Sequence, residues 1–331
     1  MNKNITAITV NWRRANDTIL CIKSLLNVVN YNLNIVVCEN GSSDESSSEL
    51  KDFLHSIFQE YSRINSACAS EIIFDYFEKE VDKDSVPKLT LVLSLKNLGF
   101  AGGNNLAYRC ISPVVRSDYI WFLNNDTEVE PDALSFMIKR MEDDEHIGIC
   151  GATLVHAHDH KTVQALGGAK YQPLLGSVRE IGSGLTWPCL VDQKAIESKM
   201  SYVSGASMLV SAAFLEKVGL MSEDYFLYYE EIDWATRARR AGFRLGYASK
   251  AVVYHKEGSV LGSGKSPQRS ALAEYYGVRN RLVVTRKFFP WALPTVYMFS
   301  WMQVAKRLFH GHYRRARLMA AVLLGFGRSD T

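Results

Sequence analysis

The feature that most constrains this chain is a repeated pattern in which a short apolar, β-rich run ends directly in polar side chains. The apolar runs cover residues 5–10, 34–38, 89–93 and 119–123. Polar ends follow them at Asn11 and at residues 39–44, 97–104 and 124–126. Strand, polar turn, helix and strand in succession indicate a mostly parallel, Rossmann-like α/β sheet with crossover helices. Such a sheet binds ligands beyond the carboxyl ends of its strands, so the four polar ends predict one shared site.

One helix of this kind is predicted after the first run. Asp17 is expected to cap it, and apolar residues continue from Ile19 to Val29 at the three-to-four spacing of a buried stripe. The stretch between residues 61 and 88 loses this helical pattern and is interpreted as a surface insertion without visible chemistry.

Composition limits the class of protein. The chain has 331 residues, of which 47% are hydrophobic and 22% charged, as expected for one large α/β domain with an appendage. The formal charge of +3 is too small to indicate nucleic-acid binding. Six cysteines without a Cys-x-x-Cys pair favour a reducing cytoplasm, and the N-terminus shows no pattern of a secretory signal.

A second acidic cluster covers residues 228–234, and a lone His255 ends another strand-like run. Together with residues 124–126, these groups could hold a divalent cation and supply a general base. The cluster is followed by three arginines and by Gly242, so an ordinary helix with acids in its first turn also explains it.

The C-terminal part has a different character. Residues 279–328 include no acidic residue, and residues 288–305 are uncharged, rich in aromatic side chains and interrupted by Pro290 and Pro294. The prolines, together with Trp291 and Trp301, favour an interfacial helix pair lying on anionic lipid. A packed helical subdomain with a basic surface is the alternative.

Five motifs occur in an order that resembles the family 2 glycosyltransferases, in particular their bacterial rhamnosyltransferase-like branch. They lie at residues 9–12, 39–44, 97–104, 124–126 and 229–233. The resemblance covers about residues 5–285 and implies the GT-A fold, a nucleotide-sugar donor, and transfer in one displacement with inversion at the anomeric carbon. It disfavours a dinucleotide-binding dehydrogenase, because the glycines of the third motif do not form Gly-x-Gly-x-x-Gly.

The resemblance assigns donor binding to the polar ends of the N-terminal strands. The implied donor-binding residues are Val10, Asn11, Trp12, Glu39, Asn97, Gly99, Phe100, Gly103, Asn104, Asn124 and Asn125. Glu39 would accept hydrogen bonds from the base or ribose, although a solvent-facing acid at a helix N-terminus is the simpler explanation.

The resemblance also implies a metal site for Mg²⁺ or Mn²⁺ at Asp126 and His255. The family's motif is Asp-x-Asp, and this chain has Asn124 in place of the first carboxylate. A hard cation can take further oxygen ligands from the donor diphosphate, so one carboxylate and one histidine are expected to suffice.

For catalysis, the family motif implies a general base at Glu231, with Glu230 as the alternative. The base is needed because an acceptor hydroxyl must lose its proton as it attacks. Asp233 is expected either to orient a sugar hydroxyl or to pair with Arg237, four residues further along the helix. The small residues of the acceptor wall are Ser204, Gly205 and Ala206, which a turn into a buried strand would explain almost as well.

The sequence therefore predicts a GT-A catalytic domain over residues 1–257, divided into a nucleotide half at 1–127 and an acceptor half at 128–257. A flexible loop at 258–270, a lid or a linker, precedes a C-terminal helical region at 271–331. The expected reaction moves rhamnose from dTDP-rhamnose to a lipid-linked or oligosaccharide acceptor in surface polysaccharide synthesis.

The expected location is the cytoplasmic face of the inner membrane, with peripheral membrane contact, no nucleic acid, and a homodimer left open. Two other functions remain: transfer from UDP-galactofuranose or a UDP-hexose, and a non-catalytic nucleotide-sugar-binding subunit of an assembly complex.

Overall fold

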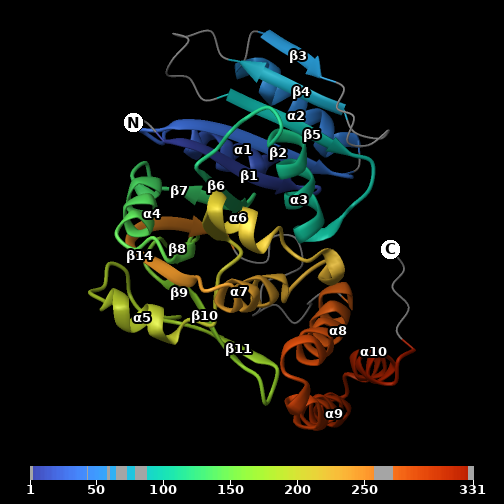
Figure 1. Ribbon diagram of the computed structural model, residues 1–331. Coiled ribbons are helices and arrows are strands. Elements are labelled where there is room, and N and C mark those ends of the chain that lie inside the picture. The colour runs from blue at the N-terminus through green and yellow to red at the C-terminus, as the bar shows by residue number, and fades with distance from the viewer. Residues whose placement is uncertain are drawn as a thin grey trace.

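A single large sheet runs through the molecule in the computed structural model, which describes residues 3–42, 44–57, 60–64, 73–78, 88–256 and 271–326 (Figure 1). The sheet has eleven strands in the order β3-β4-β5-β2-β1-β6-β13-β8-β14-β7, with β9 paired to β8. The predicted flexible loop at 258–270 lies outside the described residues.

The N-terminal half of this sheet is parallel. Its strands are β1 (Asn4–Asn11), β2 (Asn32–Asn40), β5 (Lys88–Ser94) and β6 (Tyr119–Asn124). Val10 lies opposite Cys38 on one side and Asn124 on the other. The carboxyl ends of β1, β2 and β6 therefore meet at one edge, as the sequence predicts.

The second half is mixed rather than parallel. It consists of β13 (Ser207–Ser211), β8 (Ile147–His156), β14 (Arg244–His255), β7 (Thr127–Val129) and β9 (Val163–Leu166). β13 runs antiparallel to both β6 and β8. β14 pairs antiparallel with β7, which places His255 opposite Thr127. This pairing brings the histidine to the polar end of β6.

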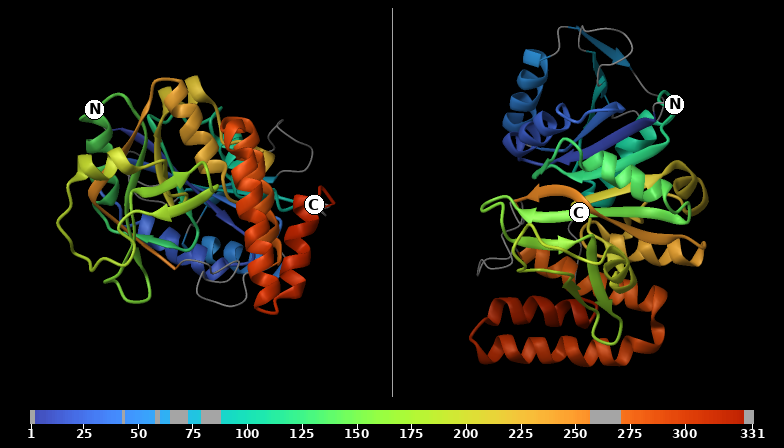
Figure 2. Two further views of the ribbon diagram at one scale, coloured as in Figure 1. Left: turned by 90° about the horizontal axis from the view of Figure 1, so that it is seen from below. Right: turned by 90° about the vertical axis from the view of Figure 1, so that its left-hand side faces the viewer.

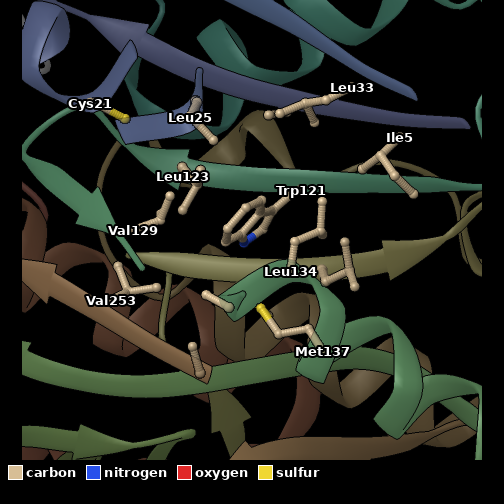
Figure 3. Close-up of a cluster of buried hydrophobic side chains, with 14 of the residues drawn as sticks. Ile5, Cys21, Leu25, Leu33, Trp121, Leu123, Val129, Leu134, Met137 and Val253 are labelled. Atoms are coloured by element: carbon tan, nitrogen blue, oxygen red, sulfur yellow. The ribbon is translucent and has the colours of Figure 1, made fainter. Parts of the chain in front are cut away.

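Both faces of the sheet are covered by helices, and strand alternation explains why. In β6, Trp121 and Leu123 point to one cluster of buried side chains, and Ile120 and Phe122 point to another. Figure 3 shows Trp121 in the first cluster, where its indole Nε1 donates to Ser207 Oγ at 3.0 Å. A strand that is apolar on both sides must be covered on both sides, which is the arrangement of an α/β protein.

Helices cover both faces of the sheet. The first cluster packs against α1 (Ala15–Leu25), α2 (Asp44–Ile57) and α4 (Ala133–Glu142). The second packs against α3 (Gly99–Ile111), α6 (Ala212–Val218) and α7 (Glu230–Arg240). The predicted α/β fold class is confirmed.

Two details of the predicted first helix were wrong. Asp17 lies in the first turn of α1 rather than at its N-cap, which is Arg14, and Val29 is half exposed beyond the helix end. The predicted surface insertion contains two strands at one end of the sheet, β3 (Glu60–Ile64) and β4 (Ile73–Glu78), which its sequence did not indicate. These strands pair antiparallel with each other, and β4 extends the sheet from β5.

A small sheet and two short helices lie beside the main sheet. The sheet has the order β11-β10-β12, formed by β10 (Gly168–Gln172), β11 (Ser177–Glu180) and β12 (Tyr202–Val203). The short helices are α5 (Gln193–Lys199) and η1 (Glu223–Tyr225).

The C-terminal part forms a helical appendage at the end of the molecule opposite β3 and β4 (Figures 1 and 2). It contains α8 (Ala271–Phe288), η2 (Pro290–Ala292), α9 (Leu293–Phe309) and α10 (Tyr313–Leu323). Pro290 and Pro294 each lie at a helix start, where a missing N–H costs nothing. The helices share a buried cluster that includes Val296 and Met319. Among the described residues, none of the helices is long and apolar enough to cross a membrane.

Candidate active site

The carboxyl ends of three parallel strands are tied together by side-chain hydrogen bonds. Asn11 is fully buried, and its amide donates to the carboxylate of Glu39 on β2 and to Ser46 Oγ. Thr18 Oγ1 donates to Asn11 Oδ1 at 2.8 Å and accepts from Asn125 Nδ2 at 3.0 Å. This network fixes the ends of β1, β2 and β6 relative to one another.

Glu39 is only 3% exposed, and its second carboxylate oxygen accepts the backbone N–H of Ser42 at 3.0 Å. It is therefore a buried strand-end acid and not the solvent-facing acid of the simpler explanation. The neighbouring Val10 and Trp12 are both half-buried at the same edge. Their contact with a nucleoside remains a prediction.

The turn before α3 is held by two asparagines. Asn97 Oδ1 accepts the backbone N–H of Gly99 at 2.8 Å and the amide of Asn40 at 3.1 Å. Asn40 Oδ1 in turn accepts the backbone N–H of Leu98. Further along α3, Gly103 lies against Val10, and Asn104 is buried, with no hydrogen-bond partner for its Oδ1 among the described residues. The motif at residues 97–104 thus packs against the ends of β1 and β2.

Gly99 brings this turn into contact with a loop more than a hundred residues away. Its φ is +74°, and a Cβ there would lie 2.2 Å from the carbonyl oxygen of Phe226. The same carbonyl accepts the backbone N–H of Phe100 at 2.7 Å. Only glycine allows this approach, so the turn before α3 and the loop before α7 form one structure.

The predicted metal-binding side chains, Asp126 after β6 and His255 at the end of β14, meet at the end of β6. Asp126 Oδ1 lies 3.1 Å from His255 Nε2, and the Asn124 amide lies 3.4 Å from the same nitrogen. Both Asp126 and His255 are more than nine-tenths buried. On the other side of the ring, His255 Nδ1 lies 2.8 Å from Gln164 Oε1. With Gln164 as acceptor, Nδ1 carries a hydrogen and Nε2 is the ring nitrogen turned toward Asp126.

This donor set fits a divalent cation. A carboxylate oxygen and an imidazole nitrogen are both metal ligands, and an outer-sphere partner such as Gln164 is what fixes a metal-binding imidazole. Asp126 and His255 would supply two ligands, and an amide rotation would turn Asn124 Oδ1 to the same point. Within the described residues, no group of three or more His, Cys, Asp and Glu side chains converges, so the remaining ligands would come from the donor and water.

Glu231, the predicted base, is linked to the end of β6 by Gly205 and Ala206, two residues of the predicted acceptor wall. Gly205 faces Glu231 so closely that a Cβ on it would lie 2.5 Å from Glu231 Oε1. The next residue, Ala206, accepts the backbone N–H of Asn124 at 3.1 Å. One short segment, residues 205–206, therefore contacts both the end of β6 and the Glu231 carboxyl.

Burial changes the acidity of this carboxyl. Desolvation raises the pKa of Glu231 to about 7, while its side chain keeps partial contact with solvent. Glu230 is 2% exposed, and burial together with the Glu231 charge raises its pKa further above the usual range. A carboxyl that titrates near neutral pH is suited to accept a proton during catalysis. Of the two, Glu231 is the partly accessible one.

Asp233 has a different environment. It is fully buried, with Arg237 Nε at 2.6 Å, Lys287 Nζ at 2.6 Å and the Tyr225 hydroxyl at 3.0 Å. It makes the ion pair with Arg237 that its spacing predicts, and a second pair with helix α8. Asp233 thus links α7 to the C-terminal helices.

The loop that leads into α7 is strained and externally supported. Phe226, Tyr228 and Tyr229 have φ values of 58°, 68° and 76°, which side chains of this size rarely adopt. Asn280 of α8 donates from Nδ2 to the carbonyl oxygens of Tyr225, Leu227 and Tyr228 at 2.6, 2.7 and 3.1 Å. The C-terminal helix therefore holds the backbone that positions the glutamates.

Sequence reasoning missed two residues of this arrangement. Gln164 showed no local signal, because its contact with His255 spans 91 residues. Asn280 interrupts a basic stretch as a buried polar side chain, but nothing in the sequence indicated its partners.

A comparison with known protein families shows the family of this chain. The profile described as glycosyltransferase-like family 2 matches residues 3–281. The chain belongs to glycosyltransferase-like family 2. The predicted family is confirmed.

Three curated relatives are similar to this glycosyltransferase over part of their length. They are the low-salt glycan biosynthesis hexosyltransferase Agl10 of Haloferax volcanii (22% identity, 58% of this chain, 59% of the relative), the rhamnosyltransferase WbbL of Escherichia coli (28%, 47% and 60%) and the dTDP-rhamnosyl transferase RfbF of Shigella flexneri (24%, 61% and 64%). The aligned regions thus span less than two thirds of each relative.

Solved structures support the predicted GT-A fold. The mannosyltransferase PcManGT from Pyrobaculum calidifontis, in complex with GDP-Man and Mn²⁺, superposes with a TM-score of 0.55 over 98% of this chain and 87% of that one. Sequence identity is 13%, so the similarity concerns the fold.

Proposed function

We propose that this glycosyltransferase is an inverting hexosyltransferase that moves rhamnose from dTDP-rhamnose to a lipid-linked or oligosaccharide acceptor in surface polysaccharide synthesis. The observation that carries the proposal is the short path from Asp126 and His255, through residues 205–206, to Glu231. It supports a reaction in which donor and acceptor meet between these groups. The rhamnosyl donor draws support from the names of two relatives, WbbL and RfbF.

In the proposed reaction, the Glu231 carboxylate accepts the proton of an acceptor hydroxyl. The freed oxygen attacks the anomeric carbon from the side opposite the diphosphate and forms the new glycosidic bond. The bond from this carbon to the diphosphate oxygen breaks, and the nucleoside diphosphate leaves with the electron pair. The product is therefore inverted at the anomeric carbon.

The other residues act by binding and orientation. Asp126 and His255 would hold Mg²⁺ or Mn²⁺, which neutralises charge on the departing diphosphate. Gln164 keeps the imidazole in place, and Asn97 shapes the donor-side turn. Small side chains at Ser204, Gly205 and Ala206 leave space for the acceptor sugar.

The proposal divides the chain into a catalytic domain at residues 1–257 and a C-terminal helical region at 271–331, separated by a loop at 258–270. It places the enzyme at the cytoplasmic face of the membrane that carries its acceptor. Two alternatives are a UDP-galactofuranose or UDP-hexose donor, and a non-catalytic nucleotide-sugar-binding subunit, which Asn124 in place of a carboxylate favours.

A thermal-shift panel tests the donor. dTDP-rhamnose, UDP-galactofuranose, UDP-glucose and GDP-mannose are added with and without Mn²⁺, because a ligand that binds only the folded state raises its melting temperature. The proposal expects a metal-dependent shift with dTDP-rhamnose. A shift with a UDP sugar alone would identify that sugar as the donor in place of dTDP-rhamnose.

Turnover tests the chemistry. Glu231→Gln should lower kcat by about 10²–10⁴-fold while leaving the donor Kd nearly unchanged, because the base acts only in the transition state. The matched control is Glu216→Gln on the exposed face of α6, which should behave like the parent. Parental turnover in Glu231→Gln would overturn this role.

A further inference from the structure

The outer face of α9 carries a continuous row of exposed apolar side chains. Met298, Trp301, Met302 and Phe309 are 62%, 40%, 61% and 89% exposed. Their spacing of three, four and seven residues places them on one side of the helix. The opposite side is buried on the C-terminal cluster through Val296 and Val304. We call these four residues the α9 outer row.

Two further side chains extend this surface beyond the helix. Trp291 of η2 is 64% exposed before α9, and Tyr313 at the start of α10 is 68% exposed after it. Tryptophan and tyrosine favour the boundary between water and lipid head groups because each ring is apolar with one polar atom.

All the charged residues of α9 and α10 are basic. From Tyr275 to Phe326 the chain has no acidic residue. The cations of α9 and α10 are Lys306, Arg307, Arg314, Arg315 and Arg317. Glu274 of α8 is the nearby acid, and it is buried, with Arg307 at 2.7 Å and Arg315 at 3.7 Å. It offsets part of the positive charge of these two arginines and leaves the surface basic.

A basic hollow lies beside the row, between α9 and α10. Its volume is about 600 Å³, and its lining includes Met302, Gln303, Lys306, Arg307, His310 and Arg315. Met302 belongs to both the hollow and the α9 outer row. The apolar row and the basic hollow are therefore one continuous surface.

We propose that this surface docks on an anionic lipid bilayer, with the α9 outer row in the head-group boundary and lipid phosphates in the basic hollow. An apolar helix face flanked by cations is the arrangement that binds such a boundary. A second copy of the chain fits less well, because a symmetric pairing of two such faces would bring the same cations together.

Docking in this orientation would turn the C-terminal helices toward the membrane and the N-terminal strands away from it. The N-terminal strands lie at the end of the molecule away from α9, and α7 lies between (Figures 1 and 2). Helix α8 joins the docking surface to the loop that Asn280 holds. A lipid-linked acceptor would reach Glu231 from the membrane side. The choice of acceptor rests on the proposed function, but the docking itself does not.

Co-sedimentation of the full chain with vesicles tests the proposal. Vesicles of phosphatidylglycerol and phosphatidylcholine should pellet the parent at physiological salt, and pure phosphatidylcholine vesicles or high salt should release most of it. Phe309→Glu should weaken binding to the mixed vesicles at least about tenfold, since a charge replaces an inserted ring. Lys306→Gln should weaken it less and reduce its salt dependence.

Leu190→Glu is the matched control, because Leu190 is fully exposed outside the C-terminal helices and its variant should bind like the parent. Equal vesicle binding by Phe309→Glu and the parent would overturn the proposal. So would a parent that elutes as a dimer and becomes a monomer on Phe309→Glu, since the face would then join two copies. Donor-induced thermal shifts measured on Phe309→Glu without vesicles report on the proposed function separately.

Discussion

The side-chain amide of Asn280 donates to the carbonyl oxygen of Tyr228, and through this contact the C-terminal helix α8 holds the strained loop before Glu230 and Glu231. Two further bonds from the same nitrogen reach Tyr225 and Leu227. A single buried amide therefore stabilises a backbone whose positive φ values are otherwise unfavourable.

Asn280→Asp should lower kcat by about tenfold or more, because a carboxylate of the same size cannot donate to the three carbonyls, and a misplaced base reacts slowly. The donor Kd should change less than kcat. Steady-state kinetics and a donor titration measure both quantities. Arg286→Gln, an exposed change on the same helix, is the control, and parental kcat in Asn280→Asp would show that the loop holds itself.

The pKa of Glu231 predicts a pH-dependent stability difference. Its folded-state pKa is raised to about 7, so between its unfolded value near 4.5 and 7 the folded state binds more protons. Stability from this group is thus present at low pH and is lost as pH rises through 7. Glu231→Gln carries no charge at any pH, so its melting temperature should exceed the parent's more at pH 8 than at pH 5. An equal difference at both values would argue against the raised pKa.

A substitution at Gly205 is expected to displace the Glu231 carboxyl without removing it. A methyl group on residue 205 would lie 2.5 Å from Glu231 Oε1, so Gly205→Ala should displace the carboxyl and lower kcat by about 10–100-fold. Donor binding should remain parental. Gly277→Ala is the control, because nothing lies within 4 Å of the added methyl. Unchanged turnover in Gly205→Ala would argue against Glu231 as the general base.

Much of this site could be predicted from the sequence because its parts lie at strand ends. Asn11, Glu39 and Asp126 follow apolar runs, and parallel strands necessarily end on one edge of the sheet. The family resemblance, carried by the order of the motifs, predicted the site residues of the second half of the sheet, including His255. Local pattern and motif order therefore predicted which segments meet.

The supports of the site could not be predicted in the same way. Gln164, Phe226 and Asn280 act through contacts of one side chain or one carbonyl with distant residues. Neither periodicity nor spacing encodes such pairs. Strands β3 and β4 were missed for a related reason, because they depend on pairing with each other and, for β4, with β5.

Asn124 predicts how the metal site can be strengthened. Its amide lies 3.4 Å from His255 Nε2, beside Asp126. Asn124→Asp should raise the affinity for Mn²⁺ without donor by about tenfold, because a second carboxylate adds a charged oxygen ligand. Calorimetric titration of the full chain with MnCl₂ measures it, and Asn124→Ala is the control. If Asn124→Asp binds Mn²⁺ no better than the control, the cation is not held at the end of β6.

Asp233 predicts a loss of stability rather than of chemistry. Its carboxylate is fully buried between Arg237 and Lys287 and accepts from the Tyr225 hydroxyl. Asp233→Asn removes the negative charge and leaves two cations without it, which should lower the free energy of unfolding by about 3 kcal/mol. Urea denaturation measures this loss, and kcat per folded molecule should stay within about threefold of the parent. Asp224→Asn is the control, since that side chain is 71% exposed and 4.0 Å from Lys287. A variant that unfolds like the parent but loses turnover would contradict this structural role.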